Sequence, residues 1–263
     1  MTVQKTRPTL WRYAGGMLLL GAMALGPNIA QPTQAQPVKA PEQNWSFKGP
    51  LGHFDLPSVQ RGYAVFAGIC ASCHSLSEVR FSDLTDMGLT LEEVGAIAAT
   101  WQVADGLDAE GRLKHRNARP DDALSSSYSG PEAARAANGG VVPPDLSRIV
   151  QVYPGGADRL FALLTGYKPD AARVPGKGFA NSFAIGHYTA MPPPLREGAV
   201  KYADNTPATV TQEARDVTTF LAWVSAPHQD TRRRVGIGAG LYLCFLAVLF
   251  VILNRRLWSH VRK

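Results

Sequence analysis

The chain has 263 residues, with 27 lysines and arginines against 21 aspartates and glutamates and a formal net charge of +6. The excess lies at the two ends, because residues 1–35 hold three basic side chains and no acid, and residues 232–263 hold seven and no acid. Residues 36–231 therefore hold 17 basic groups against all 21 acids, a net charge of −4. This distribution argues against a nucleic-acid-binding protein and suits a surface that meets basic redox carriers.

Residues 1–35 have the composition of an export signal. A basic leader ending at Arg12 precedes an apolar, small-residue-rich stretch, and cleavage is expected near Ala35, with Ala30 as the alternative. An uncleaved anchor helix is the competing interpretation, although the apolar stretch is short for a membrane span. In either case the domain that follows, residues 36–231, is expected in the bacterial periplasm.

The most specific motif is Cys70-Ala71-Ser72-Cys73-His74, the C-x-x-C-H pattern of c-type haem attachment. Two thiols at this spacing reach the two vinyl groups of one haem, and the histidine after them supplies an imidazole to the iron. A redox C-x-x-C or half of a zinc site would use the same cysteines. The remaining cysteine of the chain lies in an apolar run, far from zinc-ligand spacing. We therefore predict one covalent haem c on Cys70 and Cys73, with His74 as an axial ligand.

The sixth position of the iron decides the functional class, because two protein ligands favour electron transfer and an open position favours small molecules. Two methionines remain once the leader is removed. Met87 follows His74 by 13 residues, whereas Met191 lies in a loop that three following prolines stiffen. We predict Met191 as the sixth ligand, with a gap-filling core role as its alternative and His187 as the competing ligand.

The rest of residues 36–231 predicts a mainly α-helical cytochrome c-type haem domain with long loops. A helix should run from Leu56 to Cys70 and end in the haem motif. Further helices are expected over residues 90–101, 145–153, 157–164 and 209–226, the last packing on the haem-motif helix. Thr90 and Glu93 are expected to form a capping box at the start of the first of them. Residues 36–43 are expected to form an extended linker, and residues 104–138 a long surface excursion without periodic structure.

Residues 232–256 have the pattern of one membrane anchor. Residues 235–253 carry no charge, and as a helix they would be about 28 Å long, enough to cross a bilayer core. If the preceding domain is exported, residues 257–263 form a short cytoplasmic tail. The basic residues beside the span number three before it and four after it, so they decide little about orientation.

Together these features resemble the cytochrome c1 family, the haem-c subunits of cytochrome bc1 (ubiquinol–cytochrome c reductase) complexes. The resemblance extends over about residues 45–254 and is carried by the runs at 60–63, 70–75, 132–140, 143–147, 163–167, 190–195 and 202–209, together with the single C-terminal anchor. It implies that Cys70 and Cys73 bind haem and that His74 and Met191 ligate its iron.

The resemblance also implies partners and a location. Electrons would arrive from a Rieske iron–sulfur protein and leave to a cytochrome c, within a dimeric complex that contains cytochrome b. The chain would carry electrons without bond chemistry of its own, at the bacterial cytoplasmic membrane. A membrane-anchored cytochrome feeding a terminal oxidase outside such a complex is the alternative, and a haem enzyme or gas sensor with an open iron position is a further one.

One position departs from the family pattern. The family usually carries Arg-x-Arg in the helix after the 143–147 run, where one arginine pairs with a haem propionate. Here the corresponding run is Gln151-Val152-Tyr153. Arg159, six residues further on, is the candidate replacement for the propionate contact.

Overall fold

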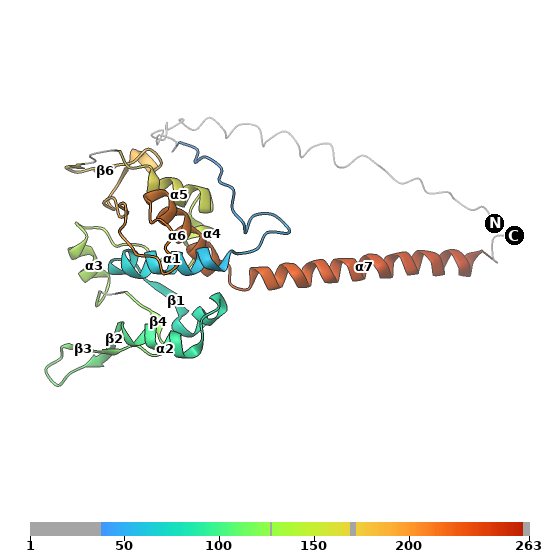
Figure 1. The fold of residues 1–263 in the computed structure, drawn as a ribbon, viewed down its shortest axis with the longest axis horizontal. Coiled ribbons are helices and arrows are strands. Elements are labelled where there is room, and N and C mark those ends of the chain that lie inside the picture. Colours follow the sequence, from blue (N-terminus) through green and yellow to red (C-terminus); the bar gives the residue numbers. More distant parts are fainter. Residues whose placement is uncertain (1–37, 127, 169–171, 260–263) are drawn as a thin grey trace, which may run out of the picture. The chain divides into compact units, whose positions relative to one another are not determined.

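The computed structural model describes residues 38–126, 128–168 and 172–259 (Figure 1), so the expected export signal lies outside the described residues. The α-helices are α1 (Leu56–Gly68), α2 (Leu91–Ala99), α3 (Pro131–Ala137), α4 (Ile149–Val152), α5 (Gly156–Thr165), α6 (Val210–Ser225) and α7 (Gln229–Trp258). Short 3₁₀ helices are η1 (Cys70–Ser72), η2 (Phe81–Met87) and η3 (Ile185–His187). The predicted mainly helical fold with one long C-terminal helix is confirmed.

The strands are short and form small antiparallel sheets. They are β1 (Leu76–Arg80), β2 (Gln102–Leu107), β3 (Leu113–Asn117), β4 (Ala123–Leu124), β5 (Arg173–Val174), β6 (Gly178–Ala180) and β7 (Tyr188–Thr189). β1 pairs with β4, β2 pairs with β3, and β6 lies between β5 and β7. The sheets therefore brace loops around a helical core.

The core is centred on the packing of α1 against α6, as the sequence predicted. Asp55 caps α1 by accepting a hydrogen bond from the Ser58 amide at 3.2 Å. The Phe220 ring on α6 lies 5.7 Å from the ring centroids of both Tyr63 and Phe66 on α1. All three rings are buried, so the helix that leads into the haem motif is held by the centre of the core.

Gly62 lies where α1 and α6 approach most closely. A Cβ atom at this position would overlap the backbone oxygen of Asp216 and lie 2.6 Å from the Cβ of Phe220. Gly62→Ala should therefore force the helices apart and lower the free energy of unfolding by about 1–3 kcal/mol. Urea unfolding of the detergent-solubilised chain measures this loss.

Gly95 provides the matched control, because it is also helical but a Cβ there meets nothing within 4 Å. Gly95→Ala should raise stability by up to about 1 kcal/mol, since alanine has the higher helix propensity. Equal effects of the two substitutions would contradict the close approach of the helices at Gly62.

The capping box predicted at the start of α2 is confirmed. Thr90 accepts a hydrogen bond from the Glu93 amide at 3.2 Å, and the Glu93 carboxylate accepts one from the Thr90 amide at 2.8 Å. The helix ends at Ala99, two residues before the predicted end. The prediction for residues 209–226 agrees with α6 to within one residue at each end.

The excursion expected over residues 104–138 lies largely at the surface, but the expectation that it is one long loop was wrong. This stretch contains most of the β2–β3 hairpin, then β4 and α3. Within the hairpin strands only Val103 is buried, so the alternation of apolar and polar residues that marks a half-buried strand is missing. Arg116 pairs with Asp122 at 2.6 Å and with Asp105 at 3.3 Å, so these acids are matched locally.

The expected linker over residues 36–43 has no helix or strand in its described part, residues 38–43, and it is bound to the rest of the domain. The Asp158 carboxylate on α5 accepts hydrogen bonds from the Gln43 amide at 2.9 Å and from Trp45 Nε1 at 2.7 Å. The Arg215 guanidinium of α6 lies 5.1 Å from the centre of the Trp45 ring. A cation over an aromatic face is attractive, so this arm is fastened to α5 and α6.

α7 is the single helix in the described part of the chain that is long and apolar enough to cross a membrane. It extends three residues before and two residues beyond the predicted anchor of residues 232–256. Its most apolar 18-residue window has a mean hydropathy of 2.6, and none of that window is buried by the rest of the chain. Lipid contact satisfies such a surface, and we treat α7 as the membrane-spanning helix.

Candidate haem-binding site

The C-x-x-C-H motif forms a tight turn directly after α1. The Cys70 carbonyl oxygen accepts hydrogen bonds from the amides of Cys73 at 3.0 Å and His74 at 2.9 Å. Both thiols are free and half-buried. Burial, assisted by the neighbouring Cys73 thiol, raises the pKa of Cys70 to about 12. The turn thus presents two thiols and an imidazole from one short segment.

The orientation of His74 is set from a distant segment. Its Nδ1 lies 2.7 Å from the carbonyl oxygen of Pro144. A carbonyl oxygen can only accept, so Nδ1 is the protonated nitrogen and Nε2 keeps its lone pair. Burial lowers the pKa of His74 more than this hydrogen bond raises it. The imidazole is therefore neutral, with Nε2 available to a metal ion.

Asp145 fastens the segment that orients His74. Its Oδ2 accepts hydrogen bonds from Ser75 Oγ at 2.6 Å and from the Ser77 amide at 2.8 Å, and its Oδ1 accepts one from the Ser147 amide at 2.8 Å. Burial opposes the charged form, but these hydrogen bonds outweigh it and lower the pKa of Asp145 to about 2. The helix predicted from residue 145 was wrong at its start, because residues 145–147 are bound to the haem motif and α4 begins at Ile149.

Met191 lies on a separate loop that follows β7. Its amide donates to Thr189 Oγ1 at 3.2 Å, and its carbonyl oxygen accepts a hydrogen bond from the Tyr167 hydroxyl at 3.0 Å. Met191 and Cys70 are both partly buried against the same hydrophobic core. The structure therefore brings the loop of the predicted sixth ligand and the haem motif to one core, although 117 residues separate Met191 from His74.

Two residues that hold this loop had no assigned role in the sequence. Burial raises the pKa of Tyr167, which keeps its hydroxyl protonated as a donor to Met191. Asn181 is buried, donates to the Leu163 carbonyl oxygen at 2.7 Å and accepts from the Phe183 amide at 2.9 Å. Tyr167 belongs to the 163–167 run noted above, whereas no sequence signal pointed to Asn181.

Met87 and His187, the alternatives to Met191 as sixth ligand, lie in surroundings that differ from each other. Met87 is 1% exposed within the core, and its carbonyl oxygen accepts from Gln60 Nε2 at 2.8 Å. Its surroundings are those of a core side chain. His187 is exposed in η3 at a positive φ of 62°. It lies four residues before Met191, on the other side of β7.

Arg159 is buried in α5, where it is 6% exposed. Its Nη1 donates to the Val38 carbonyl oxygen at 3.0 Å, and its Nε has no hydrogen-bond partner among the described residues. A buried guanidinium nitrogen without a partner is costly, and a carboxylate would satisfy it. The sequence placed Arg159 as a propionate partner, and its free donor is compatible with that role.

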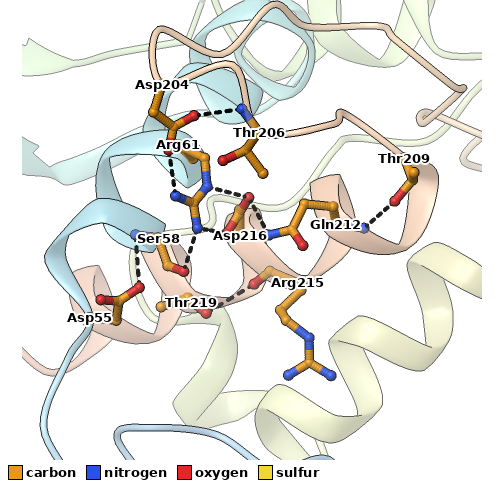
Figure 2. Close-up of polar contacts among 10 residues, drawn as sticks. All are labelled: Asp55, Ser58, Arg61, Asp204, Thr206, Thr209, Gln212, Arg215, Asp216 and Thr219. Atoms are coloured by element: carbon orange, nitrogen blue, oxygen red, sulfur yellow. Dashed lines mark hydrogen bonds and ion pairs between the residues drawn. The ribbon is translucent and has the colours of Figure 1, made fainter.

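The segment after Met191 is tied to both core helices (Figure 2). Arg61 of α1 donates through Nε to Asp216 of α6 at 3.0 Å and through Nη1 to Asp204 at 2.8 Å. The Val200 amide donates to Glu213 Oε1 at 3.3 Å. The runs at 60–63 and 202–209 therefore meet at Arg61, and residues 192–209 are held to α1 and α6 at Val200 and Asp204.

Glu213 is fully buried, and its Oε2 has no hydrogen-bond partner among the described residues. Burial raises its pKa, the Glu197 charge adds to this, and hydrogen bonds from the Val200 and Ala199 amides and the Arg196 charge oppose it. The folded protein therefore binds this proton more tightly than the unfolded chain, whose glutamates titrate near 4.3. The resulting stabilisation is complete below about pH 4 and is lost as pH rises through the raised pKa.

Glu213→Gln should remove this pH dependence. The variant and the unchanged protein should have similar melting temperatures near pH 4, and the variant should become the more stable of the two as pH rises. Glu197→Gln should only weaken the pH dependence, because Glu197 is exposed and its charge is one of several causes that raise the pKa of Glu213. Parallel melting profiles for Glu213→Gln and the unchanged chain from pH 4 to 8 would show that folding does not raise the pKa of Glu213.

The donor set fits a covalently attached haem. Cys70 and Cys73 offer two thiols from one turn, and His74 offers an oriented imidazole nitrogen. Met191 offers a thioether from a braced loop, and Arg159 has an unmatched buried donor. These groups match a porphyrin's vinyl groups, iron and propionate in kind.

Comparison with known proteins gives the same family. Residues 45–261 match the Cytochrome C1 family. "Cytochrome c1, heme protein, mitochondrial" of Kluyveromyces lactis is 42% identical over 228 residues, 85% of this chain and 78% of that protein. "Cytochrome c1" of Rhodospirillum rubrum is 32% identical over 263 residues, 93% of this chain and 97% of that protein.

A third relative is longer. "Cytochrome b/c1" of Bradyrhizobium diazoefficiens is 36% identical over 245 residues, which are 84% of this chain, and the chain spans 36% of that protein's length. The family match extends over most of the chain, and the relatives match it at 32–42% identity. This chain belongs to the cytochrome c1 family.

Proposed function

We propose that this chain binds one covalent haem c through Cys70 and Cys73, with His74 and Met191 as its axial ligands. As a member of the cytochrome c1 family, it is an electron-transfer subunit of a cytochrome bc1 complex. In our proposal it takes single electrons from a Rieske iron–sulfur protein and passes them to a cytochrome c. The observation that carries the ligand assignment is the hydrogen bond of His74 Nδ1 to Pro144, because it leaves Nε2 as the free nitrogen.

The protein's own contribution is to hold the two proposed axial ligands, His74 and Met191, in fixed positions. When bound, the haem iron supplies the one-electron redox chemistry. The Pro144 carbonyl oxygen fixes the tautomer of His74 and makes the imidazole a stronger donor. Tyr167 and Thr189 hold the backbone of Met191 from both sides. A ligand set that does not move when the charge of the iron changes keeps the reorganisation between redox states small.

We further infer that the chain works beside cytochrome b in a dimeric complex, and that the haem domain lies in the periplasm of a bacterium. The name of the Bradyrhizobium relative, cytochrome b/c1, supports the association with cytochrome b. The membrane-spanning α7 and the composition of residues 1–35 support the location. Residues 232–256 would then be the anchor and residues 257–263 the cytoplasmic tail.

The function is tested on membranes solubilised in a mild detergent. We expect the chain to stain for covalent haem after denaturing electrophoresis and to co-purify with a b-type cytochrome and a Rieske centre. Cys70→Ser combined with Cys73→Ser should abolish the stain, whereas Cys244→Ser on α7 should retain it. A haem-stained chain that purifies without the b-type cytochrome and the Rieske centre would favour a separate anchored cytochrome. Absence of the stain from the unchanged chain would overturn the haem assignment.

A further inference from the structure

The membrane helix is joined directly to a loop that precedes α1. The Asp230 carboxylate, in the first turn of α7, accepts a hydrogen bond from the Phe54 amide at 3.0 Å. Arg233, one turn later, donates through Nη1 to the Gly52 carbonyl oxygen at 2.6 Å. The loop lies beside the start of α7 (Figure 1), and it is attached to the same helix that crosses the bilayer.

The rise of an α-helix gives the height of this junction. The uncharged stretch of α7 begins at Val235, so at 1.5 Å per residue Arg233 lies about 3 Å and Asp230 about 7.5 Å before it. The headgroup layer on each side of a bilayer is roughly 5–8 Å thick. The backbone at Gly52 and Phe54 is therefore bound to residues at headgroup height, not to residues far out in water.

Much of the surface of this loop is apolar, although His53 and Asp55 are exposed polar side chains within it. Leu51 is 81% exposed and Leu56 is 39% exposed, and the prolines Pro50 and Pro57 beside them are exposed as well. Phe54, between them, is buried in the core. The loop thus turns one apolar side chain inward and two outward, and the outward pair lies next to the bilayer end of the domain.

The basic side chains around the loop also suit a position beside lipid headgroups. Arg232 and Arg234 of α7 are exposed, as is Lys48 just before the loop, which makes a 3.7 Å ion pair with Asp158. Basic side chains at the ends of a membrane helix bind lipid phosphates while their stems lie along apolar surface. A neighbouring layer of phospholipid headgroups and acyl chains satisfies both the leucines and the arginines.

We propose that residues 49–57, which comprise the loop before α1 and the first two residues of that helix, contact the membrane, with Leu51 inserted at the boundary between the headgroups and acyl chains of the bilayer that α7 crosses. The haem domain then has two attachments to the membrane, a spanning helix and an interfacial loop. Two attachments restrict tilting about the start of α7, so the domain keeps one height and one orientation towards its redox partners.

Site-directed spin labelling of the whole complex in phosphatidylcholine and phosphatidylglycerol nanodiscs tests this contact. The label is placed at Leu51→Cys in a Cys244→Ser background. Leu107→Cys is the matched control, because Leu107 on the β2–β3 hairpin is also exposed, at 66%, and no contact of the α7 junction involves it. We expect the label at 51 to collide several-fold more with oxygen, relative to a water-soluble nickel chelate, than the label at 107.

Two outcomes would overturn the proposal. Equal access of both labels to the nickel chelate would place the loop in water. Protection of the label at 51 from both reagents would place it against another protein subunit. The Cys244→Ser background without an added cysteine is labelled in parallel: signal on this chain there would mean that Cys70 or Cys73 is free, which is a failure of the haem assignment and is independent of the loop.

Discussion

Replacing Met191 with leucine is expected to lower the midpoint potential of the haem by on the order of 0.1 V, within the roughly 0.8 V over which axial ligands set haem potentials. Leucine has no lone pair to bind iron, and the loss of thioether sulfur removes a ligand that favours Fe(II). The rate of turnover with a cytochrome c as electron acceptor should fall together with the midpoint potential. Redox titration followed by visible absorbance measures the change.

Carbon monoxide distinguishes the ways in which the sixth position can be filled. If it is left open in Met191→Leu, the reduced protein should bind carbon monoxide, which the unchanged protein should not. If His187, four residues before Met191, takes the position, carbon monoxide should bind only after His187→Ala is added. The potential falls in both cases, because an imidazole favours Fe(II) less than a thioether does.

Met87→Leu is the matched control for this experiment. Met87 is buried in η2 and is the other methionine of the haem domain. A volume-conserving change there should cost less than about 1.5 kcal/mol of stability and leave the potential unchanged. An unchanged potential in Met191→Leu would refute the ligand assignment, and a fall in Met87→Leu of the same size would transfer the assignment to Met87.

Arg61→Met is expected to reduce the free energy of unfolding by about 3–5 kcal/mol, because it leaves the Asp216 carboxylate charged inside the protein. Asp216 is fully buried, and Arg61 binds it through Nε at 3.0 Å and Nη2 at 3.2 Å (Figure 2). These hydrogen bonds outweigh burial and raise the pKa of Arg61. Gln212 Nε2, at 2.9 Å, is the donor that Asp216 would keep.

The second carboxylate on Arg61 provides the contrast. The Asp204 side chain is 44% exposed, so water replaces much of what Asp204→Asn removes, and the cost should be under about 1 kcal/mol. Adding Asp216→Asn to Arg61→Met should recover much of the lost stability, because the buried charge is then gone. Chemical unfolding of the three variants measures these differences. Similar losses for Arg61→Met and Asp204→Asn would mean that Asp216 is not an isolated buried charge.

Local features were determined by the sequence, because they depend on neighbours along the chain. The helix before the haem motif, the capping box at Thr90 and the membrane helix after His228 each follow from spacing, caps or a long uncharged run, and each is present close to its predicted bounds. The C-x-x-C-H motif and the runs around it were sufficient to identify the cytochrome c1 family, which the comparisons show. The ligand assignment for Met191 and the propionate role of Arg159 remain predictions.

The two failures have separate physical causes. The β2–β3 hairpin was missed because both of its faces are largely exposed, so the hydrophobic pattern that marks a strand is absent. The helix expected from Asp145 was placed too early, because the Asp145 carboxylate accepts hydrogen bonds from Ser75 and Ser77, about 70 residues earlier in the chain. Competition of this kind between local helix formation and distant hydrogen bonds has no signature in a short window.

What only the tertiary structure decided is which distant groups meet. Pro144 belongs to the 143–147 run, and only the structure shows that its carbonyl oxygen orients His74. Arg61 and Asp216 are 155 positions apart and form one buried pair, and Gly52 and Arg233 join the domain to its anchor across 181 positions. A hydrogen bond depends on distances of a few ångströms in space, and spacing along the chain carries that information only within a helix, a strand or a turn.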